Sequence, residues 1–209
     1  MPGRMSPLSA LANINQCLGH GAQRFVKATS DSELMRQVRS GRTAALATLF
    51  ERHHARVYGY CLRMTGNRST AEDLVQAVFM KMLKYKATFK EDSELVPWMF
   101  GIARNSCLAH LKRRANDHLP ATPTMEETAA DDAHDEPHDD RESDLVRQAL
   151  LRLPAERREV LVLSRFEYKS YDEIAHMLDC SVGAVKVRVH RAMKQLREIY
   201  LDMAGEVSA

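Results

Sequence analysis

Residues 170–196 read SYDEIAHMLDCSVGAVKVRVHRAMKQL, and they give the strongest indication of the fold of the C-terminal part of the chain. The S-x-x-E pattern at 170–173 is a capping box, which predicts a short helix over Tyr171–Leu178. The next three residues, Asp179–Ser181, predict a tight turn, and their serine suits the cap of a second helix from 182 to about 200. Two helices joined by so short a turn are typical of a helix-turn-helix.

The second helix separates its apolar and basic residues onto opposite faces. The residues expected to pack inward are Val182, Val185, Val189, Ala192, Met193 and Leu196. The opposite arc carries small and basic residues, namely Gly183, Ala184, Val187, His190, Arg191 and Lys194, with Lys186 and Arg188 beside it. An amphipathic surface helix shows a similar division, but the short turn and the small residues at the helix start favour a recognition helix in a major groove.

The side chains on the outer arc suit different parts of DNA. Arg191 is long enough to reach a base edge, with two hydrogen bonds if it meets guanine, and Val187 can contact a thymine methyl group. Lys186, Arg188 and Lys194 suit phosphates, and the helix start can donate backbone N–H groups to another phosphate. The predicted DNA contacts of this helix are Ser181, Gly183, Lys186, Val187, Arg188, His190, Arg191 and Lys194.

The N-terminal half of the chain is predicted to be helical as well. A short helix capped by Ser30 is expected to stop at Gly41. A longer amphipathic helix of about six turns follows, and it is expected to end at Thr65–Asn67.

Two further helices are predicted in this half. A third helix is expected to begin at Ser69 or Thr70, which places Glu72 and Asp73 in its first turn, where the helix dipole favours acids. After a polar connection over 86–94, a proline marks the first turn of a fourth helix. This helix is expected to face the core with Trp98, Ile102, Leu108 and Leu111 and to end in the basic run Lys112, Arg113 and Arg114.

Residues 116–143 differ sharply in composition from the rest. Between Asn116 and Asp144 there are 11 acidic residues and one basic residue, Arg141, whereas the remaining chain has 29 Lys and Arg against 17 Asp and Glu. Because such a segment buries too little apolar surface to offset chain entropy, it is predicted to be a disordered tether with an average span of about 30 Å. Basic bodies on both sides of it suggest a polyanionic partner.

Several classes of protein are not supported by the sequence. The four cysteines stand singly without a CxxC pair, so they predict buried small hydrophobes and no zinc site. No apolar run approaches the ~18 residues of a membrane span, and residues 1–29 make a poor secretory signal, which predicts a cytoplasmic protein. Phosphate loops and hydrolase motifs are missing, so neither enzymatic activity nor a cofactor is expected. His118, His134 and His138 lie among carboxylates, but solvated disorder is the default for such a segment.

Two separate parts of the chain resemble one known family. Residues 151–163, LRLPAERREVLVL, together with residues 170–196, resemble region 4 of the extracytoplasmic-function (ECF) sigma factors, a group within the sigma-70 family. The N-terminal half resembles regions 2.1 to 2.4 of the same family at LFERHHARVY (49–58), AEDLVQAVF (71–79) and PWMFGIARN (97–105). The resemblance covers roughly residues 31–115 and 145–200.

The resemblance implies a sigma factor that directs RNA polymerase to promoters, reads minus-ten and minus-thirty-five elements and helps to open DNA. It implies as partners the core polymerase, through its β′ clamp helices and β flap, promoter DNA, and an anti-sigma factor. The positions that match polymerase-binding residues are Asp73, Leu74, Gln76 and Val78. Those that match the minus-ten site, where a flipped base is held, are Trp98, Arg104, Asn105, Lys112, Arg113 and Arg114. The positions that match the minus-thirty-five reading residues are Lys186, Val187, His190 and Arg191.

The chain departs from the family pattern in both halves. Ala77 stands where the family often has Glu, and Ala109 where it often has Asp or Asn. The segment EDSELV at 91–96 brings three acids near the DNA. Ala184 and Val187 replace commoner hydroxyl residues, so the minus-thirty-five sequence is not carried over.

The expected fold is all-α, with two small helical domains joined by a flexible acidic linker. The expected organisation is a flexible extension over 1–29, a region 2-like domain over 30–115, the linker over 116–143, a region 4-like helix-turn-helix domain over 144–200 and a tail over 201–209. The alternative function is a helix-turn-helix repressor or activator that acts without docking on polymerase. The target promoters and the inducing signal are not encoded in any recognisable motif.

Overall fold

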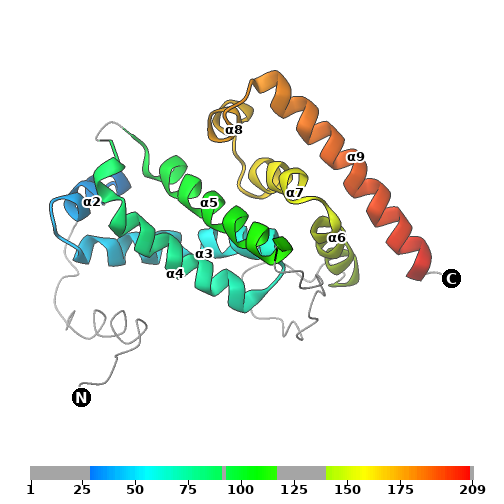
Figure 1. The fold of residues 1–209 in the computed structure, drawn as a ribbon, viewed down its shortest axis with the longest axis horizontal. Helices are drawn as coiled ribbons and strands as arrows, with labels where there is room; N and C mark the ends of the chain where they lie inside the picture. The colour runs from blue at the N-terminus through cyan, green and yellow to red at the C-terminus, as the bar shows by residue number, and fades with distance from the viewer. Residues whose placement is uncertain (1–28, 91–92, 117–139, 208–209) are drawn as a thin grey trace, which may run out of the picture.

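The computed structural model describes residues 29–90, 93–116 and 140–207, and within these ranges the chain is helical without a strand (Figure 1). Its α-helices are α2 (Asp31–Arg39), α3 (Ala44–Thr65), α4 (Arg68–Lys84), α5 (Leu95–Asn116), α6 (Asp140–Arg152), α7 (Ala155–Leu161), α8 (Tyr171–Leu178) and α9 (Val182–Val207). A 3-10 turn, Lys86–Thr88, precedes α5, and a π-helical turn, Val162–Phe166, follows α7. The all-α prediction is confirmed. None of these helices combines the length and apolar character that a membrane span requires.

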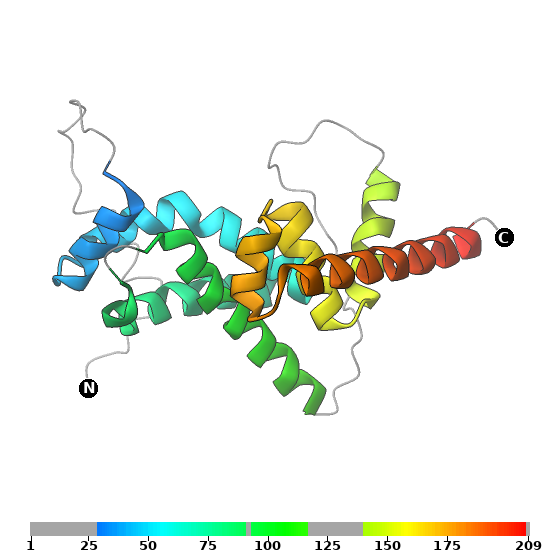
Figure 2. The ribbon, with the colours of Figure 1, turned by 90° about the horizontal axis from the view of Figure 1, so that it is seen from above.

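Helices α2 to α5 form the first helical module, in which α3 lies against α2, α4 and α5 (Figure 2). Its core is built from fully buried side chains that include Leu49, Val57, Tyr60, Met64, Val78, Met82, Met99 and Phe100. Cys61 and Cys107 are also buried there, with their Sγ atoms 3.6 Å apart. These two cysteines therefore behave as the small core hydrophobes that the sequence predicts.

The turn between α3 and α4 partly follows the prediction. Gly66 ends α3 with φ at 72°, a left-handed conformation that favours glycine. However, α4 begins at Arg68, because the side chain of Asn67 accepts a hydrogen bond from Thr70 N. The predicted cap at Ser69 or Thr70 is therefore wrong, and Glu72 and Asp73 lie beyond the first turn of α4.

The core-facing side of α5 is shifted from the expected one. Leu95, Met99, Phe100, Ala103 and Cys107 are the buried apolar residues of this helix. The predicted inward residues are only partly buried and lie along the edge of the core, namely Trp98, Ile102, Leu108 and Leu111. The shift arises because α5 packs against α3 and α4 together, and the helical pattern alone does not say which neighbours a helix has.

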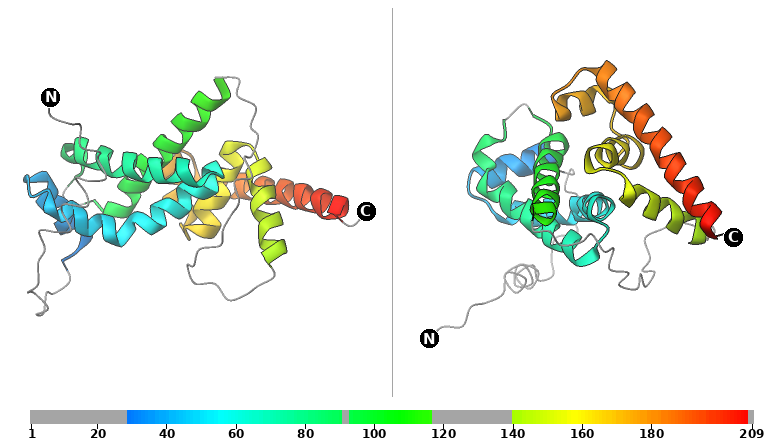
Figure 3. Two further views of the ribbon diagram at one scale, coloured as in Figure 1. Left: turned by 90° about the horizontal axis from the view of Figure 1, so that it is seen from below. Right: turned by 45° about the vertical axis from the view of Figure 1, so that its right-hand side comes forward.

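Helices α6 to α9 form the second helical module, in which α9 lies along α7, α6 and α8 (Figure 3). Helix α9 continues to Val207, well past the predicted end near Tyr200. The extra turns pack on α6, where Met203 is 4% exposed and Tyr200 Oη donates to Glu142 at 3.4 Å. Most of the segment expected to be a tail is thus helical, and α6 begins within the segment expected to be linker.

The two modules contact each other along one side of each. Helix α3 lies against α6, α7 and the π-helical turn, and α5 lies against α8 (Figure 3). Leu151 of α6 reaches the turn after α3, where a Cβ on Gly66 would come within 2.6 Å of its side chain. The buried residues form one continuous cluster across both modules.

Candidate nucleic-acid interface

The first helix of the helix-turn-helix, α8, begins with the predicted capping box. Ser170 Oγ accepts from Glu173 N at 3.2 Å, and Ser170 N donates to Glu173 Oε2 at 2.8 Å. Lys169 Nζ lies 2.6 Å from Glu173 Oε1, and this hydrogen bond lowers the pKa of the Glu173 carboxyl. These local bonds set the start of α8 and with it the position of the turn that follows.

The turn between α8 and α9 is tight. Asp179 has φ at 48°, in the left-handed region, and its N–H donates to Ala175 O. Ser181 Oγ accepts from Ala184 N at 3.1 Å, so the predicted cap of α9 is confirmed. Ser181 and Gly183 are exposed, which leaves the N-terminus of α9 open to an approaching phosphate.

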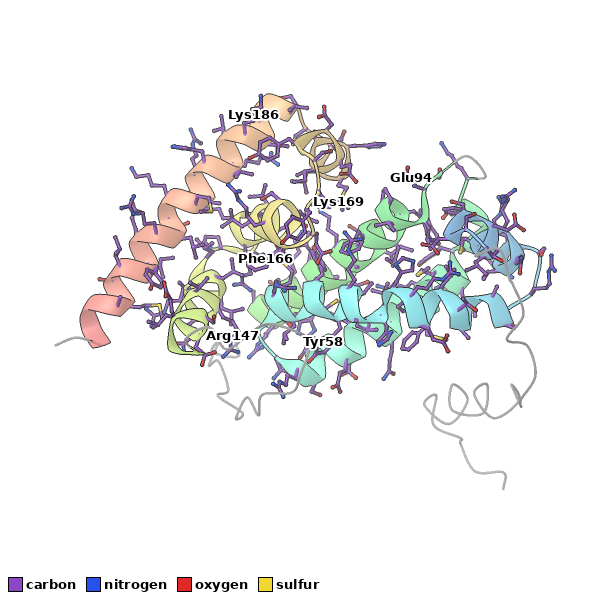
Figure 4. All side chains as sticks on the ribbon, turned by 180° about the vertical axis from the view of Figure 1, so that it is seen from behind. Tyr58, Glu94, Arg147, Phe166, Lys169 and Lys186 are labelled. Carbon is purple, nitrogen blue, oxygen red and sulfur yellow. The ribbon has the colours of Figure 1, made fainter. Side chains whose placement is uncertain are left out.

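Helix α9 presents a basic outer face. Val185, Val189 and Ala192 are buried against the module. The exposed residues on the other side include Lys186, Val187, Arg188, His190, Arg191 and Lys194, and Figure 4 shows Lys186 at the outer edge of the molecule. Met193 is 38% exposed, so the prediction that it packs fully inward is wrong. Val187 is 48% exposed, so its apolar side chain is accessible on this face.

The C-terminal half of α5 carries a second basic face. Asn105, Lys112 and Arg113 are exposed, and Arg114 is half-buried. Burial lowers the pKa of His110, and the nearby Arg113 and Arg114 lower it further. The indole of Trp98 packs edge-on against Phe89, with the ring centroids 5.4 Å apart, so it anchors the loop before α5 to the core.

Arg104 differs from the other predicted minus-ten residues. Its Nε lies 2.7 Å from Oε1 of Glu159 on α7, and the Glu159 side chain is 3% exposed. The two atoms are close without the alignment of a good hydrogen bond. Burial raises the pKa of the Glu159 carboxyl, and the charge of Arg104 acts in the opposite direction. In this arrangement Arg104 is occupied by the second module.

The predicted polymerase-binding residues divide between surface and core. Asp73 is exposed and Gln76 is half-buried, whereas Leu74 and Val78 are 6% and 0% exposed and belong to the core. Leu74 and Val78 are therefore corrected to packing residues of α4. Met80 lies seven residues after Asp73, on the same face of α4, and is 62% exposed. Met80 was not among the predicted polymerase-binding residues.

A cavity of about 420 Å³ lies between the modules. Its lining brings together Arg104 and residues of the second module, namely Glu156, Arg157, Glu159, Leu178, Arg188 and Arg191. Two parts of the predicted DNA-binding surface, from α5 and from α9, thus face one space. Within the described residues no cluster of acids, histidines or cysteines suits a metal ion, and the histidines at 118, 134 and 138 lie outside the described residues.

Comparison with known families agrees with this arrangement. Residues 49–116 match the family model described as Sigma-70 region 2, and residues 143–196 match Sigma-70, region 4. The RNA polymerase sigma factor CarQ of Myxococcus xanthus is 34% identical over 177 residues, covering 83% of this chain and 99% of that protein. The ECF RNA polymerase sigma factor EcfG of Rhodopseudomonas palustris is 31% identical over 148 residues, with 70% and 81% covered.

Solved structures show the same architecture. CnrH, in complex with the cytosolic domain of CnrY, has a TM-score of 0.62 and 25% identity, covering 83% of this chain and 97% of that one. The sigma factor RpoE from Bartonella quintana, in complex with the anti-sigma factor NepR, shares the fold, with a TM-score of 0.58, 24% identity and coverage of 78% and 96%.

The chain belongs to the sigma-70 family of RNA polymerase sigma factors and, within it, to the extracytoplasmic-function group. It is therefore a promoter-specific initiation factor that binds core RNA polymerase and promoter DNA. The family is one of initiation factors rather than of enzymes. This assignment confirms the resemblance seen in the sequence and sets aside the stand-alone repressor.

Proposed function

We propose that the two helical modules divide promoter recognition between them, with α9 reading the minus-thirty-five element and α5 holding the opened minus-ten strand. The observation that carries this proposal is the basic, exposed outer face of α9 behind a capped turn. Arg191 reads a base edge, and Val187 contacts a methyl group. Lys186 and Lys194 bind phosphates on either side.

In the first module, α5 supplies the contacts to the minus-ten strand. Lys112 and Arg113 lie exposed at the end of the helix, where they suit the phosphates of a single strand. Asn105 is exposed about two turns earlier on the same helix, where its amide suits a base edge. Trp98, held by Phe89, positions the loop near the flipped base. The domain boundaries proposed for these roles are 30–115 and 144–200.

Helix α4 docks on the β′ clamp helices in this proposal. Asp73, Gln76 and Met80 are the α4 side chains that reach the surface on one side, and they offer a carboxylate, an amide and an apolar tip. A mixed polar and apolar face of this kind is typical of a protein interface. The second module contacts the β flap, and an anti-sigma factor is a further partner that the family suggests. Since polymerase and promoter are in the cytoplasm, the protein acts there. As an initiation factor it has no catalytic activity of its own.

Reconstituted transcription tests the proposal. Core RNA polymerase is incubated with sheared genomic DNA, with and without the protein, and the 5′ ends of the transcripts are mapped. We expect a set of starts that appears only with the protein and shares two upstream sequence elements. Starts that are unchanged by the protein, or that lack a shared minus-thirty-five element, would contradict the proposal. Arg191→Ala serves as the matched variant, and it should reduce the starts without loss of folding.

A further inference from the structure

Cys61 of α3 and Cys107 of α5 meet in the core of the first module. Their Sγ atoms lie 3.6 Å apart, and both residues are fully buried. They are 46 positions apart in the chain, so it is the packing of α3 against α5 that brings them together. Burial suits a single cysteine as a small apolar side chain, but it does not require two sulfur atoms to meet. Two thiols in contact have a chemistry that an isolated buried cysteine lacks.

The separation of the two sulfur atoms is not far from that of a disulfide. The S–S bond is about 2.05 Å long, so the sulfur atoms must approach each other by roughly 1.5 Å to form it. The remaining cysteine of the described residues, Cys180, is half-buried in the turn between α8 and α9, in the other module. Within the described part of the chain, Cys61 and Cys107 are therefore each other's nearest partner for such a bond.

The two thiols of the pair are not equivalent. The Cys107 thiol donates a hydrogen bond to Cys61 Sγ. This hydrogen bond raises the pKa of the Cys107 thiol, and burial raises it further. A sulfur atom that accepts a hydrogen bond is favoured as the thiolate, and the thiolate is the reactive form of cysteine. The geometry thus makes Cys61 the nucleophile and Cys107 the thiol that resolves its oxidation product.

We propose that Cys61 and Cys107 form a reversible oxidation site, at which a peroxide converts the two thiols into a disulfide that fastens α3 to α5. Because both sulfur atoms are buried, the oxidant has to be small and uncharged, as hydrogen peroxide is. In a reducing compartment the dithiol is the resting form, and a disulfide is transient and tied to redox change. The chemistry of the pair is independent of the proposed promoter contacts.

The oxidation takes place in two steps that balance. In the first, the Cys61 thiolate attacks one peroxide oxygen, an S–O bond forms, the O–O bond breaks, and the departing hydroxide takes up a proton to leave as water. In the second, the Cys107 sulfur attacks the sulfur of the resulting sulfenic acid. An S–S bond forms, the S–O bond breaks, and the hydroxyl group leaves as water with the Cys107 proton. The two thiols lose two electrons, and one peroxide gains them.

The bond acts as a staple across the first module. It links positions 46 residues apart and so encloses α4, together with parts of α3 and α5, in a covalent loop. A loop of this length restricts the unfolded chain, and the oxidised protein should melt roughly 5–10 °C above the reduced protein.

Peptide mapping on the full chain tests the site. The double variant Cys17→Ser, Cys180→Ser keeps Cys61 and Cys107 as its only cysteines and leaves the core of the first module unchanged. It is treated with hydrogen peroxide, unfolded in an alkylating reagent and digested with trypsin. We expect one linked product of residues 57–63 and 105–112, with the summed mass of the two peptides less two hydrogen atoms. Dithiothreitol should separate it into its two halves.

Single core variants in the same background assign the two roles. Cys107→Ala leaves Cys61 without a resolving thiol, so dimedone should trap a sulfenic acid at Cys61. Cys61→Ala should leave Cys107 largely unlabelled under the same conditions. Circular dichroism checks that each variant is folded, and the peptide map of the double variant decides the proposal even if a core variant does not fold.

Three outcomes would overturn the staple. The first is complete alkylation of both cysteines after peroxide treatment. The second is a disulfide between two copies of the chain, seen as a doubled mass on a non-reducing gel. The third is a linked peptide whose protein melts at the same or a lower temperature than the reduced form, because the bond would then not hold α3 to α5. Dimedone labelling at Cys107 in place of Cys61 would overturn the assignment of the nucleophile.

Discussion

At the scale of single residues, Arg191 is the most informative side chain of α9. It is exposed on the outer face, and no ion pair to it is found within the described residues. We expect Arg191→Ala to cost about 1–3 kcal/mol in affinity for the mapped minus-thirty-five duplex and to leave affinity for scrambled DNA nearly unchanged. Fluorescence anisotropy at fixed salt measures both affinities.

A second exposed arginine of α9 provides the control. Arg197 lies six residues further along the helix and outside the predicted reading set. Arg197→Ala should weaken both duplexes slightly and equally, as the loss of a general positive charge would. If Arg191→Ala gave the same small and equal loss, Arg191 would be a phosphate contact and another residue would read the base.

At the scale of helices, the capping box of α8 is the feature that the local sequence determines most directly. Ser170→Ala removes the acceptor for Glu173 N, and we expect it to lower the free energy of unfolding by about 1 kcal/mol. Urea denaturation followed by circular dichroism measures this loss. Since the two bonds of the box are reciprocal, the losses in Ser170→Ala and Glu173→Ala should sum to more than the loss in the double variant. Strict additivity would mean that each bond forms without the other.

At the scale of the whole molecule, docking on polymerase and reading of the minus-thirty-five element should be separable. The double variant Asp73→Ala, Gln76→Ala changes the exposed face of α4 and is distant from the outer face of α9 in the chain's fold. We expect it to weaken binding to core polymerase by about 1–2 kcal/mol and to leave the affinity for the minus-thirty-five duplex unchanged. Biolayer interferometry with immobilised core enzyme measures the first quantity.

The neighbouring acid on α4 tests the specificity of this effect. Glu72 is exposed and carries the same charge as Asp73, but it precedes the proposed docking face. Glu72→Ala should therefore bind core polymerase like the wild type. Equal losses in Glu72→Ala and in the double variant would indicate a general charge effect and would move the docking surface away from Asp73 and Gln76.

Most helices, and many of their ends, follow from local sequence patterns. The range Tyr171–Leu178 is the same in prediction and structure, because Ser170 and Glu173 bond to groups three residues away. The cap at Ser181 and the turn at Gly66 have equally local causes. Errors arose where several residues can serve the same local purpose, as at Asn67, which caps α4 in place of Ser69 or Thr70. The exposed basic residues of α9 were also predictable, since one helix period separates them from its buried stripe.

Which charged side chains remain accessible depends on how the helices pack together. The apolar pattern of α4 already predicts an inward face that includes Leu74 and Val78, and α3 and α5 pack against it. Arg104 is occupied by a carboxylate 55 residues away, and Arg56 by one 111 residues away. Hydrogen bonds within a helix turn depend on neighbours in the chain, whereas these ion pairs depend on how the two helical modules meet. The sequence specifies the chemical groups of the side chains, but long-range packing determines which groups come into contact.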